Sequence, residues 1–128
     1  MMIDFQKAEI PAEADSTGVS PVTAIAFTEG TVYFSDIANN RIMKFDSVAG
    51  TTSVFREPSG RANGLLFDPQ GRLLACEGNE FGDNDGNRRI TRTDLMTGEL
   101  EVLTDNFEGK KYNAPNDIAA CSNGQIFF

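Results

Sequence analysis

The sequence predicts an all-β protein that forms part of a β-propeller. Strand-like runs rich in Val, Ile, Leu, Phe and Thr alternate with short turns that contain glycine or proline. No stretch shows sustained helical periodicity. A pair of hairpin modules also recurs along the chain. Four strands in a repeat of roughly 40–50 residues are typical of one propeller blade.

The first module is a hairpin that occurs three times. Its two longer copies, NGLLFDPQGRLLA and NDIAACSNGQIFF, begin at Asn63 and Asn116, and each carries a turn glycine eight residues later. A shorter copy, TAIAFTEGTVYF, begins at Thr23. The three turn glycines, at positions 30, 71 and 124, give periods of 71 − 30 = 41 and 124 − 71 = 53 residues.

The second module is another hairpin, which occurs twice and alternates with the first. It reads NRIMKFDSVAGTTSVF from Asn40 and NRRITRTDLMTGELEVL from Asn87. When one extra arginine is allowed in the second copy, four pairs of residues match at an offset of 48: Ile42 and Ile90, Asp46 and Asp94, Gly50 and Gly98, Val54 and Val102. Two hairpins together make one four-stranded blade.

The chain holds roughly two and a half such blades, whereas a propeller needs about four to eight to close. The run QIFF at 125–128 reads as the second strand of a hairpin with no further partner. We therefore expect either a fragment of a longer chain or a ring completed by further copies, which would self-associate through the open blade edge. The expected organisation is an N-terminal extension, 1–20, and a partial propeller, 21–128.

Charge and composition exclude several classes of protein. Eleven Lys and Arg against 19 Asp and Glu give a net charge of 11 − 19 = −8, which argues against a nucleic-acid partner. No apolar run is long enough to cross a membrane. The N-terminus lacks the cationic start and apolar core of a signal peptide. The compartment stays open, with a cytoplasmic protein as the default expectation.

The absence of histidine limits the chemistry further. Neither a Ser-His-Asp nor a Cys-His catalytic arrangement can be built within this chain. The residues favour a metal site of oxygen ligands, which suits Ca²⁺, Mg²⁺ or Mn²⁺. Cys76 and Cys121 lie far apart in apolar runs, so we expect two buried free thiols rather than a disulfide.

The second blade is longer than the first because of two loops. The interval from the turn glycine to the second module grows from 10 to 16 residues, and the interval from that module to the next blade grows from 23 to 29. The additions fall in EGNEFGDNDG and DNFEGKKYNAP. Alternate loops of an antiparallel blade share one face, so both should lie beside the entries to the inner strands. Long loops on one face of a repeat scaffold indicate the binding face.

Asn116 and Asp117 are the leading site candidates, because side-chain oxygens at a channel mouth suit a hard cation. The structural alternative is an Asn-Asp pair that bonds its own backbone at a strand entry. Asn63 holds the same repeat position but precedes a glycine, so a turn role competes there. Lys110, Lys111 and Tyr112 could contact an anionic or polyhydroxylated ligand, with a solvated loop as the alternative.

The acidic loop that begins at Glu77 contains Glu80, Asp83 and Asp85. It resembles a calcium loop, but an EF-hand alignment fails at Phe81 and at Arg92. We therefore expect a solvated acidic loop, neutralised by the arginines that follow it. Glu29 sits in the turn TEGT and is expected to face away from the binding face.

The chain resembles the gluconolactonase branch of the SMP-30/gluconolactonase/LRE-like family. The resemblance covers roughly residues 21–128 and rests on the runs SDIANNRIMKFD, VFREPSGRANGLLFDPQGRLLACEG, NRRITRTD and GKKYNAPNDI. It implies a six-bladed propeller that binds one divalent cation, Ca²⁺ or another such as Mg²⁺, Mn²⁺ or Zn²⁺, and hydrolyses a sugar lactone such as gluconolactone. The alternative is a non-catalytic propeller that binds a partner or acts as a scaffold.

The resemblance also implies roles for individual residues. Asn116 matches the family Asn that contacts metal or substrate in the motif N-[SA]-P-N-D, and Asn113 and Asp117 belong to the same motif. The family's first-blade metal ligand is a Glu. Here either Thr23 or Val19 holds its position and the ligand is lost, or Glu29 is its remnant. The remaining ligand and the catalytic Asp would lie beyond Phe128, so this chain alone is expected to be inactive.

Overall fold

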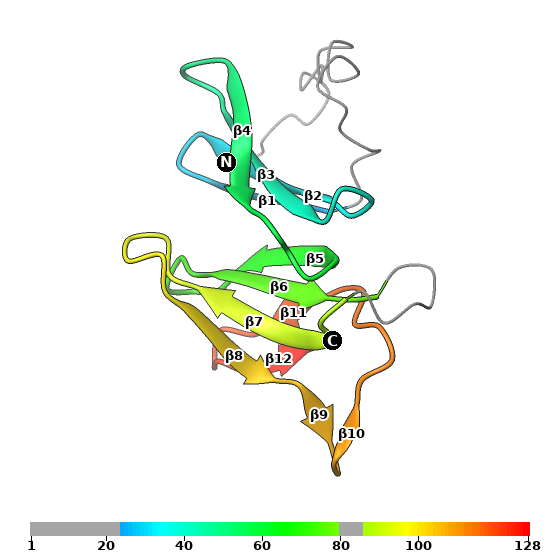
Figure 1. Ribbon diagram of the computed structural model, residues 1–128. Helices are drawn as coiled ribbons and strands as arrows, with labels where there is room; N and C mark the ends of the chain where they lie inside the picture. The colour runs from blue at the N-terminus through cyan, green and yellow to red at the C-terminus, as the bar shows by residue number, and fades with distance from the viewer. Residues whose placement is uncertain (1–23, 80–85) are drawn as a thin grey trace.

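The computed structural model describes residues 24–79 and 86–128, and these form twelve strands and no helix (Figure 1). Blade 1 is an antiparallel sheet in the order β1-β2-β3-β4, with strands at Ile25–Thr28, Thr31–Asp36, Arg41–Asp46 and Thr51–Arg56. Blade 2 repeats this order as β5-β6-β7-β8, with strands at Ala62–Phe67, Leu73–Glu77, Arg89–Thr93 and Leu100–Thr104. The predicted pair of hairpins in each blade is confirmed.

Two shorter hairpins follow blade 2. A small hairpin, β9 (Asn106–Phe107) with β10 (Lys110–Lys111), extends from the end of β8 (Figure 1). From the sequence this segment was predicted to be a plain loop. The last hairpin, β11 (Ala119–Ala120) with β12 (Ile126–Phe127), is the third copy of the first module.

The outer hairpins of the two blades turn in the same way, as their matching sequences predict. In each, an aspartate at the end of the third strand accepts two backbone hydrogen bonds: Asp46 from Val48 and Ala49, and Asp94 from Met96 and Thr97. These bonds lower the pKa of both carboxyls from its ordinary value. The turn glycines that follow both adopt a positive φ.

The core lies between the two blades. It consists of buried side chains from both sheets, with Ala26, Tyr33 and Ile42 from blade 1 and Ala62, Leu65, Leu73 and Ala75 from blade 2. The ring of Tyr33 meets Phe55 and Phe67 edge-on, at centroid distances of 5.0 and 5.6 Å. Strand β5 contacts both β1 and β2, so the first strands of successive blades lie side by side on the inner side.

Strand direction gives each blade two ends. We call the end at which β2 and β6 finish and β5 begins the loop face, and the opposite end, with the tight turns after β1, β3, β5 and β7, the turn face. The segment that carries β9 and β10 and the described ends of the connection between β6 and β7 lie on the loop face, as predicted. The position of β5 at the core therefore brings its first residues to the inner side of the loop face.

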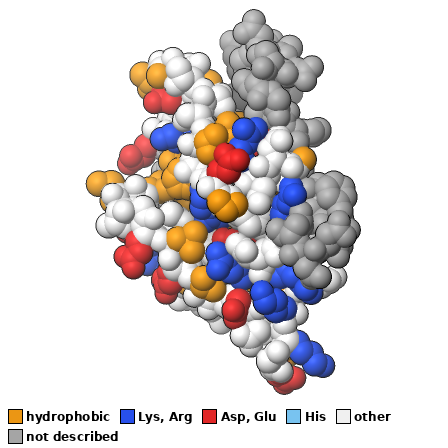
Figure 2. All heavy atoms as spheres, viewed as in Figure 1, with side chains coloured by type: hydrophobic (Ala, Val, Ile, Leu, Met, Phe, Trp, Pro, Cys, Tyr) orange, Lys and Arg blue, Asp and Glu red, His pale blue; other side chains and the backbone are white. Residues whose placement is uncertain are grey.

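Strand alternation leaves one face of blade 1 uncovered by blade 2. Ala26 joins the core, whereas its neighbours Ile25 and Phe27 are 55% and 57% exposed, and Val54 is also exposed. Hydrophobic side chains are visible among interspersed acidic and basic ones on the face shown in Figure 2. Self-association through this part of the molecule stays a prediction. Among residues 24–79 and 86–128 there is no helix that could cross a membrane.

The two cysteines differ in environment. Both are free thiols, and Cys76 is fully buried as predicted, but Cys121 is exposed. The prediction of two buried thiols was therefore wrong for Cys121, which precedes the turn between β11 and β12. A turn places its residues at the surface whatever the hydropathy of the run before it.

Candidate functional site

The inner ends of two successive blades meet on the loop face at Asn63 and Asn116. The backbone N–H of Gly64 donates a 2.8 Å hydrogen bond to the carbonyl of Asn116. The side-chain amide of Asn63 donates to Oδ1 of Asn116. A Cβ at Gly64 would lie 2.8 Å from the Asn116 carbonyl oxygen and from Cα of Asp117. Only glycine permits this approach, so the glycine after Asn63 is what brings the two asparagines together.

The segment from Asn113 to Asp117 enters the third hairpin with its polar side chains exposed. Pro115, by contrast, is buried. One carboxylate oxygen of Asp117 accepts the backbone N–H of Ile118 at 2.9 Å, so the local backbone-bonding alternative holds for this oxygen. The structure thus brings Asn63 into contact with Asn116. Asn113 and Asp117 lie in the same exposed segment as Asn116.

The chemistry of these groups fits a hard cation. A side-chain carbonyl oxygen has two lone pairs, and the Asn63 amide uses one of those on Asn116 Oδ1. The other lone pair and the second carboxylate oxygen of Asp117 are oxygen donors of the kind that Ca²⁺ prefers. Within the described ranges, no three His, Cys, Asp or Glu side chains group as they would around a metal ion.

Glu29 lies apart from this group. It occupies the turn between β1 and β2 with a φ of 45°, which places it on the turn face, at the opposite end of the blade from Asn63. The structure does not bring it to Asn116. Val19 and Thr23, the alternative positions for a first-blade ligand, lie outside the described residues, as do Glu80, Asp83 and Asp85.

Glu77 differs from the expected solvated acidic residue, because its side chain is 1% exposed. The prediction of a solvated position was wrong here. Its carboxylate pairs with Arg89 at 2.7 Å, as the neutralisation hypothesis expected, and accepts a hydrogen bond from Thr91 at 2.9 Å. It also pairs with Arg56 of blade 1 at 3.2 Å. Glu77 therefore joins the two blades through a buried ion pair.

Arg56 and Arg88 connect separate parts of the chain, a role that their sequence positions did not predict. Burial lowers the pKa of Arg56, which the charge of Glu77 opposes. Arg56 also donates to the carbonyl of Ser59 at 3.2 Å. Arg88 Nε donates to the carbonyls of Tyr112 and Asn113 at 2.7 and 3.0 Å. Repeat matching could have signalled Arg88, because it lies 48 residues after Asn40, whose loop has the same position in blade 1.

Lys110, Lys111 and Tyr112 have different roles. Both lysines are exposed on β10. The hydroxyl of Tyr112 bonds to Thr104 Oγ1 at 2.7 Å and to the carbonyl of Asn106 at 2.9 Å, and its ring meets Phe128 edge-on. Tyr112 therefore anchors the β9–β10 hairpin beside the candidate site.

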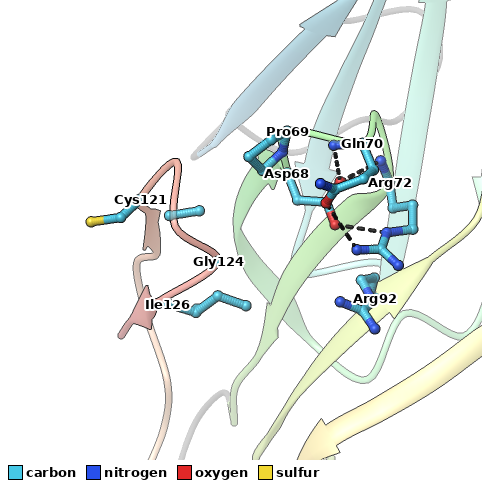
Figure 3. A pocket seen from close by; sticks show the side chains of 9 residues that line it. Asp68, Pro69, Gln70, Arg72, Arg92, Cys121, Gly124 and Ile126 are labelled. Atoms are coloured by element: carbon cyan, nitrogen blue, oxygen red, sulfur yellow. Dashed lines mark hydrogen bonds and ion pairs between the residues drawn. The ribbon is translucent and has the colours of Figure 1, made fainter.

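A small pocket opens at the other end of blade 2, on the turn face (Figure 3). It has a volume of about 40 Å³ and lies between the β5–β6 turn, which carries the ion pair Asp68–Arg72, and the β11–β12 hairpin. The sulfur of Cys121 points away from this ion pair (Figure 3). A space of this size holds water rather than a sugar. The candidate site therefore remains the polar group on the loop face.

Repeated four-stranded blades, with polar side chains gathered where their inner strands begin, define a β-propeller with a candidate ligand site on one face. Residues 20–128 match the family described as the SMP-30/gluconolactonase/LRE-like region. The chain belongs to this family.

Individual relatives agree with this assignment. The chain is 29% identical to a gluconolactonase of Zymomonas mobilis, over 85% of its own length and 35% of the relative's. It is 30% identical to a solved gluconolactonase of Xanthomonas campestris, with a TM-score of 0.71 over 84% of this chain and 34% of that one. A virginiamycin B lyase of Staphylococcus aureus, at 17% identity, 84% and 33% coverage and a TM-score of 0.60, shares the fold. The chain thus spans about a third of the length of the relatives it matches.

Proposed function

We propose that this chain contributes the Asn63–Asn116 part of the active site of a divalent-metal-dependent lactonase that acts on a sugar lactone such as gluconolactone. The observation that carries the proposal is the meeting of two successive inner strands on the loop face, with Asn63 donating to Oδ1 of Asn116. Membership of a family that includes gluconolactonases supports the reaction class.

In this proposal Asn116 Oδ1 ligates the cation, for which Ca²⁺ is the first choice because all the nearby donors are oxygens. A bound cation would polarise the lactone carbonyl and stabilise the negative charge that develops on its oxygen. Asn63 orients the amide of Asn116, and the exposed side chains of Asn113 and Asp117 contact the hydroxyl groups of the substrate. The base that activates water would come from another blade.

The test uses the protein in its natural full length. Hydrolysis of glucono-δ-lactone is followed by proton release, with and without Ca²⁺, for the wild type and for Asn116→Ala. We expect Ca²⁺-dependent hydrolysis that falls at least about tenfold in the variant.

The matched control is Asn123→Ala. Asn123 is also an exposed asparagine, but it lies in the β11–β12 turn on the turn face, where it contacts Gln125. This variant should hydrolyse the lactone like the wild type. Hydrolysis that ignores Ca²⁺, or that Asn116→Ala leaves unchanged, would contradict the proposal and favour a non-catalytic binding role for this face.

A further inference from the structure

The segment 113–117 is held by its backbone carbonyls as well as by the side-chain bond between Asn63 and Asn116. Three residues of blade 2 donate hydrogen bonds to backbone carbonyls between residues 112 and 117. Arg88 Nε donates to the carbonyls of Tyr112 and Asn113. The backbone N–H of Gly64 donates to the carbonyl of Asn116, and the thiol of Cys76 donates to the carbonyl of Asp117 at 3.3 Å. We call Arg88, Gly64 and Cys76 the carbonyl clamp. The clamp uses only backbone oxygens, so it occupies no side-chain oxygen of Asn113, Asn116 or Asp117. Asn116 Oδ1 still accepts from Asn63, and one oxygen of Asp117 accepts from Ile118.

Blade 1 holds the entry to blade 2 in a related way. The residue that matches Cys76 at the end of the second strand is Ser35, and its hydroxyl donates to the carbonyl of Asn63 at 2.6 Å. The residue that matches Arg88 is Asn40, and both have left-handed φ angles, 56° and 59°. Asn40 Oδ1 accepts the backbone N–H of Arg61 at 2.8 Å. In each blade, side chains at the same two repeat positions thus hydrogen-bond to the backbone that leads into the next blade.

The position of Cys76 makes its thiol a donor to the segment. Its side chain is fully buried at the end of β6, and its sulfur lies 3.3 Å from the carbonyl oxygen of Asp117. The Arg88 bond is charge-assisted, which makes it the stronger of the two side-chain bonds in the clamp.

We infer that Arg88 and Cys76 are positioning residues for the ligand groups of Asn113, Asn116 and Asp117. The inference rests on the proposed function, because it assigns these residues to the site proposed above. Neither residue needs to touch the cation or the lactone. Partners that orient ligand side chains are commonly worth 10–100-fold in metal affinity or activity when removed, and we expect an effect of about this size for Arg88.

The test compares Arg88→Met with Arg92→Met in the full-length protein. Arg92 is a matched control, because it lies on β7, the strand that begins directly after Arg88, but pairs with the half-exposed Glu101 at 2.6 Å. Two readouts are measured: the hydrogen-exchange rate of the Gly64 amide, which reports on the clamp without any ligand, and the Kd of Ca²⁺ by calorimetry. The melting temperature of each variant is recorded beside them.

We expect Arg88→Met to exchange the Gly64 amide at least about tenfold faster and to weaken the Kd of Ca²⁺ by about 10–100-fold. Arg92→Met should change neither, and the two variants should have similar melting temperatures. Unchanged exchange in Arg88→Met would overturn the clamp. Faster exchange with an unchanged Kd would overturn the positioning role.

The thiol has its own pair of variants. Cys76→Ala removes the donor, whereas Cys76→Ser keeps one and copies Ser35 of blade 1. The serine variant should restore most of the Ca²⁺ affinity that the alanine variant loses, and equal affinities would contradict a positioning role for Cys76. If the wild type itself binds no Ca²⁺, the proposed function fails, and the clamp is judged from the exchange of Gly64 alone.

Discussion

Blade 1 and blade 2 share a strand order and a turn pattern, but their second strands end on different carboxylates, Asp36 in blade 1 and Glu77 in blade 2. Asp36 pairs with Arg41 at 2.6 Å and accepts from Asn39, both within its own blade. Glu77, at the matching position in blade 2, pairs with Arg89 in the same way and is also reached by Arg56 from blade 1. The side chain of Glu77 is one methylene longer than that of Asp36, and its second ion pair, with Arg56, connects the two blades. A repeat can therefore keep its fold while one position acquires a connecting role.

The largest expected effect separates these two carboxylates. Glu77→Gln removes a buried charge that faces two guanidinium groups, and Arg56 Nε is buried with no hydrogen-bond partner in the part of the chain that the structure describes. We expect the variant to lose about 3–5 kcal/mol in its free energy of unfolding. Asp36→Asn should lose about 1–3 kcal/mol, because it weakens the pair with Arg41 inside blade 1 and leaves the pair between the blades intact. Urea denaturation measures both, and equal losses would remove the special role of Glu77.

A smaller effect separates two glycines. Gly64→Ala places a methyl group against the backbone of Asn116 and Asp117, so we expect a loss of about 1–3 kcal/mol together with weaker Ca²⁺ binding. Gly50→Ala, in the outer turn of blade 1, meets no atom within 4 Å but has a φ of +66°. It should cost about 1–2 kcal/mol and leave Ca²⁺ binding unchanged. Calorimetric titration with Ca²⁺ distinguishes the two variants. Unchanged Ca²⁺ binding by Gly64→Ala would contradict a role for the close contact between Gly64 and Asn116.

The two thiols sharpen the contrast between a buried and an exposed position. Iodoacetamide at pH 8 should modify Cys121 and spare Cys76, whose pKa of about 12, against an ordinary 9.0, leaves about a thousandfold less thiolate. Mass spectrometry after a short exposure shows which peptide is modified. Rapid modification of both would show that Cys76 is not held in the interior.

The same shift has a consequence for stability. A raised pKa means that the unfolded thiol ionises first, so the contribution is fully present below pH 9 and is lost as the pH rises toward 12. Cys76→Ser should therefore reduce the dependence of the free energy of unfolding on pH between pH 9 and 12, whereas Cys121→Ser should leave it unchanged.

The smallest effect should be equal in the two blades. Asp46→Ala and Asp94→Ala each remove two backbone hydrogen bonds from an exposed turn. The lowered pKa of each aspartate means that its contribution is present above pH 3.8 and is lost as the pH falls through the lowered value. Both variants should therefore be slightly less stable than the wild type at pH 7 and match it in strong acid. Unequal losses at pH 7 would show that the two turns are not equivalent.

The sequence was informative where the chain repeats and uninformative where blades contact one another. Matching hairpins predicted the strand order, and unequal repeat lengths predicted which end carries the loops and which asparagines begin the inner strands. The partner of Glu77 from the other blade is Arg56, 21 residues earlier in the chain, and local spacing carries no signal of such a pair. The exposure of Cys121 and the carbonyl contacts of Arg88 likewise depend on how successive hairpins pack.

The most direct test of the candidate site is an NMR titration of the full-length protein with Ca²⁺, following side-chain amide resonances of asparagine. The resonances of Asn63, Asn113 and Asn116 should shift together and saturate with one Kd, while that of Asn123 on the turn face stays in place. Shifts confined to the turn face, or none at the Asn63–Asn116 contact, would contradict a cation site at the meeting of the two inner strands.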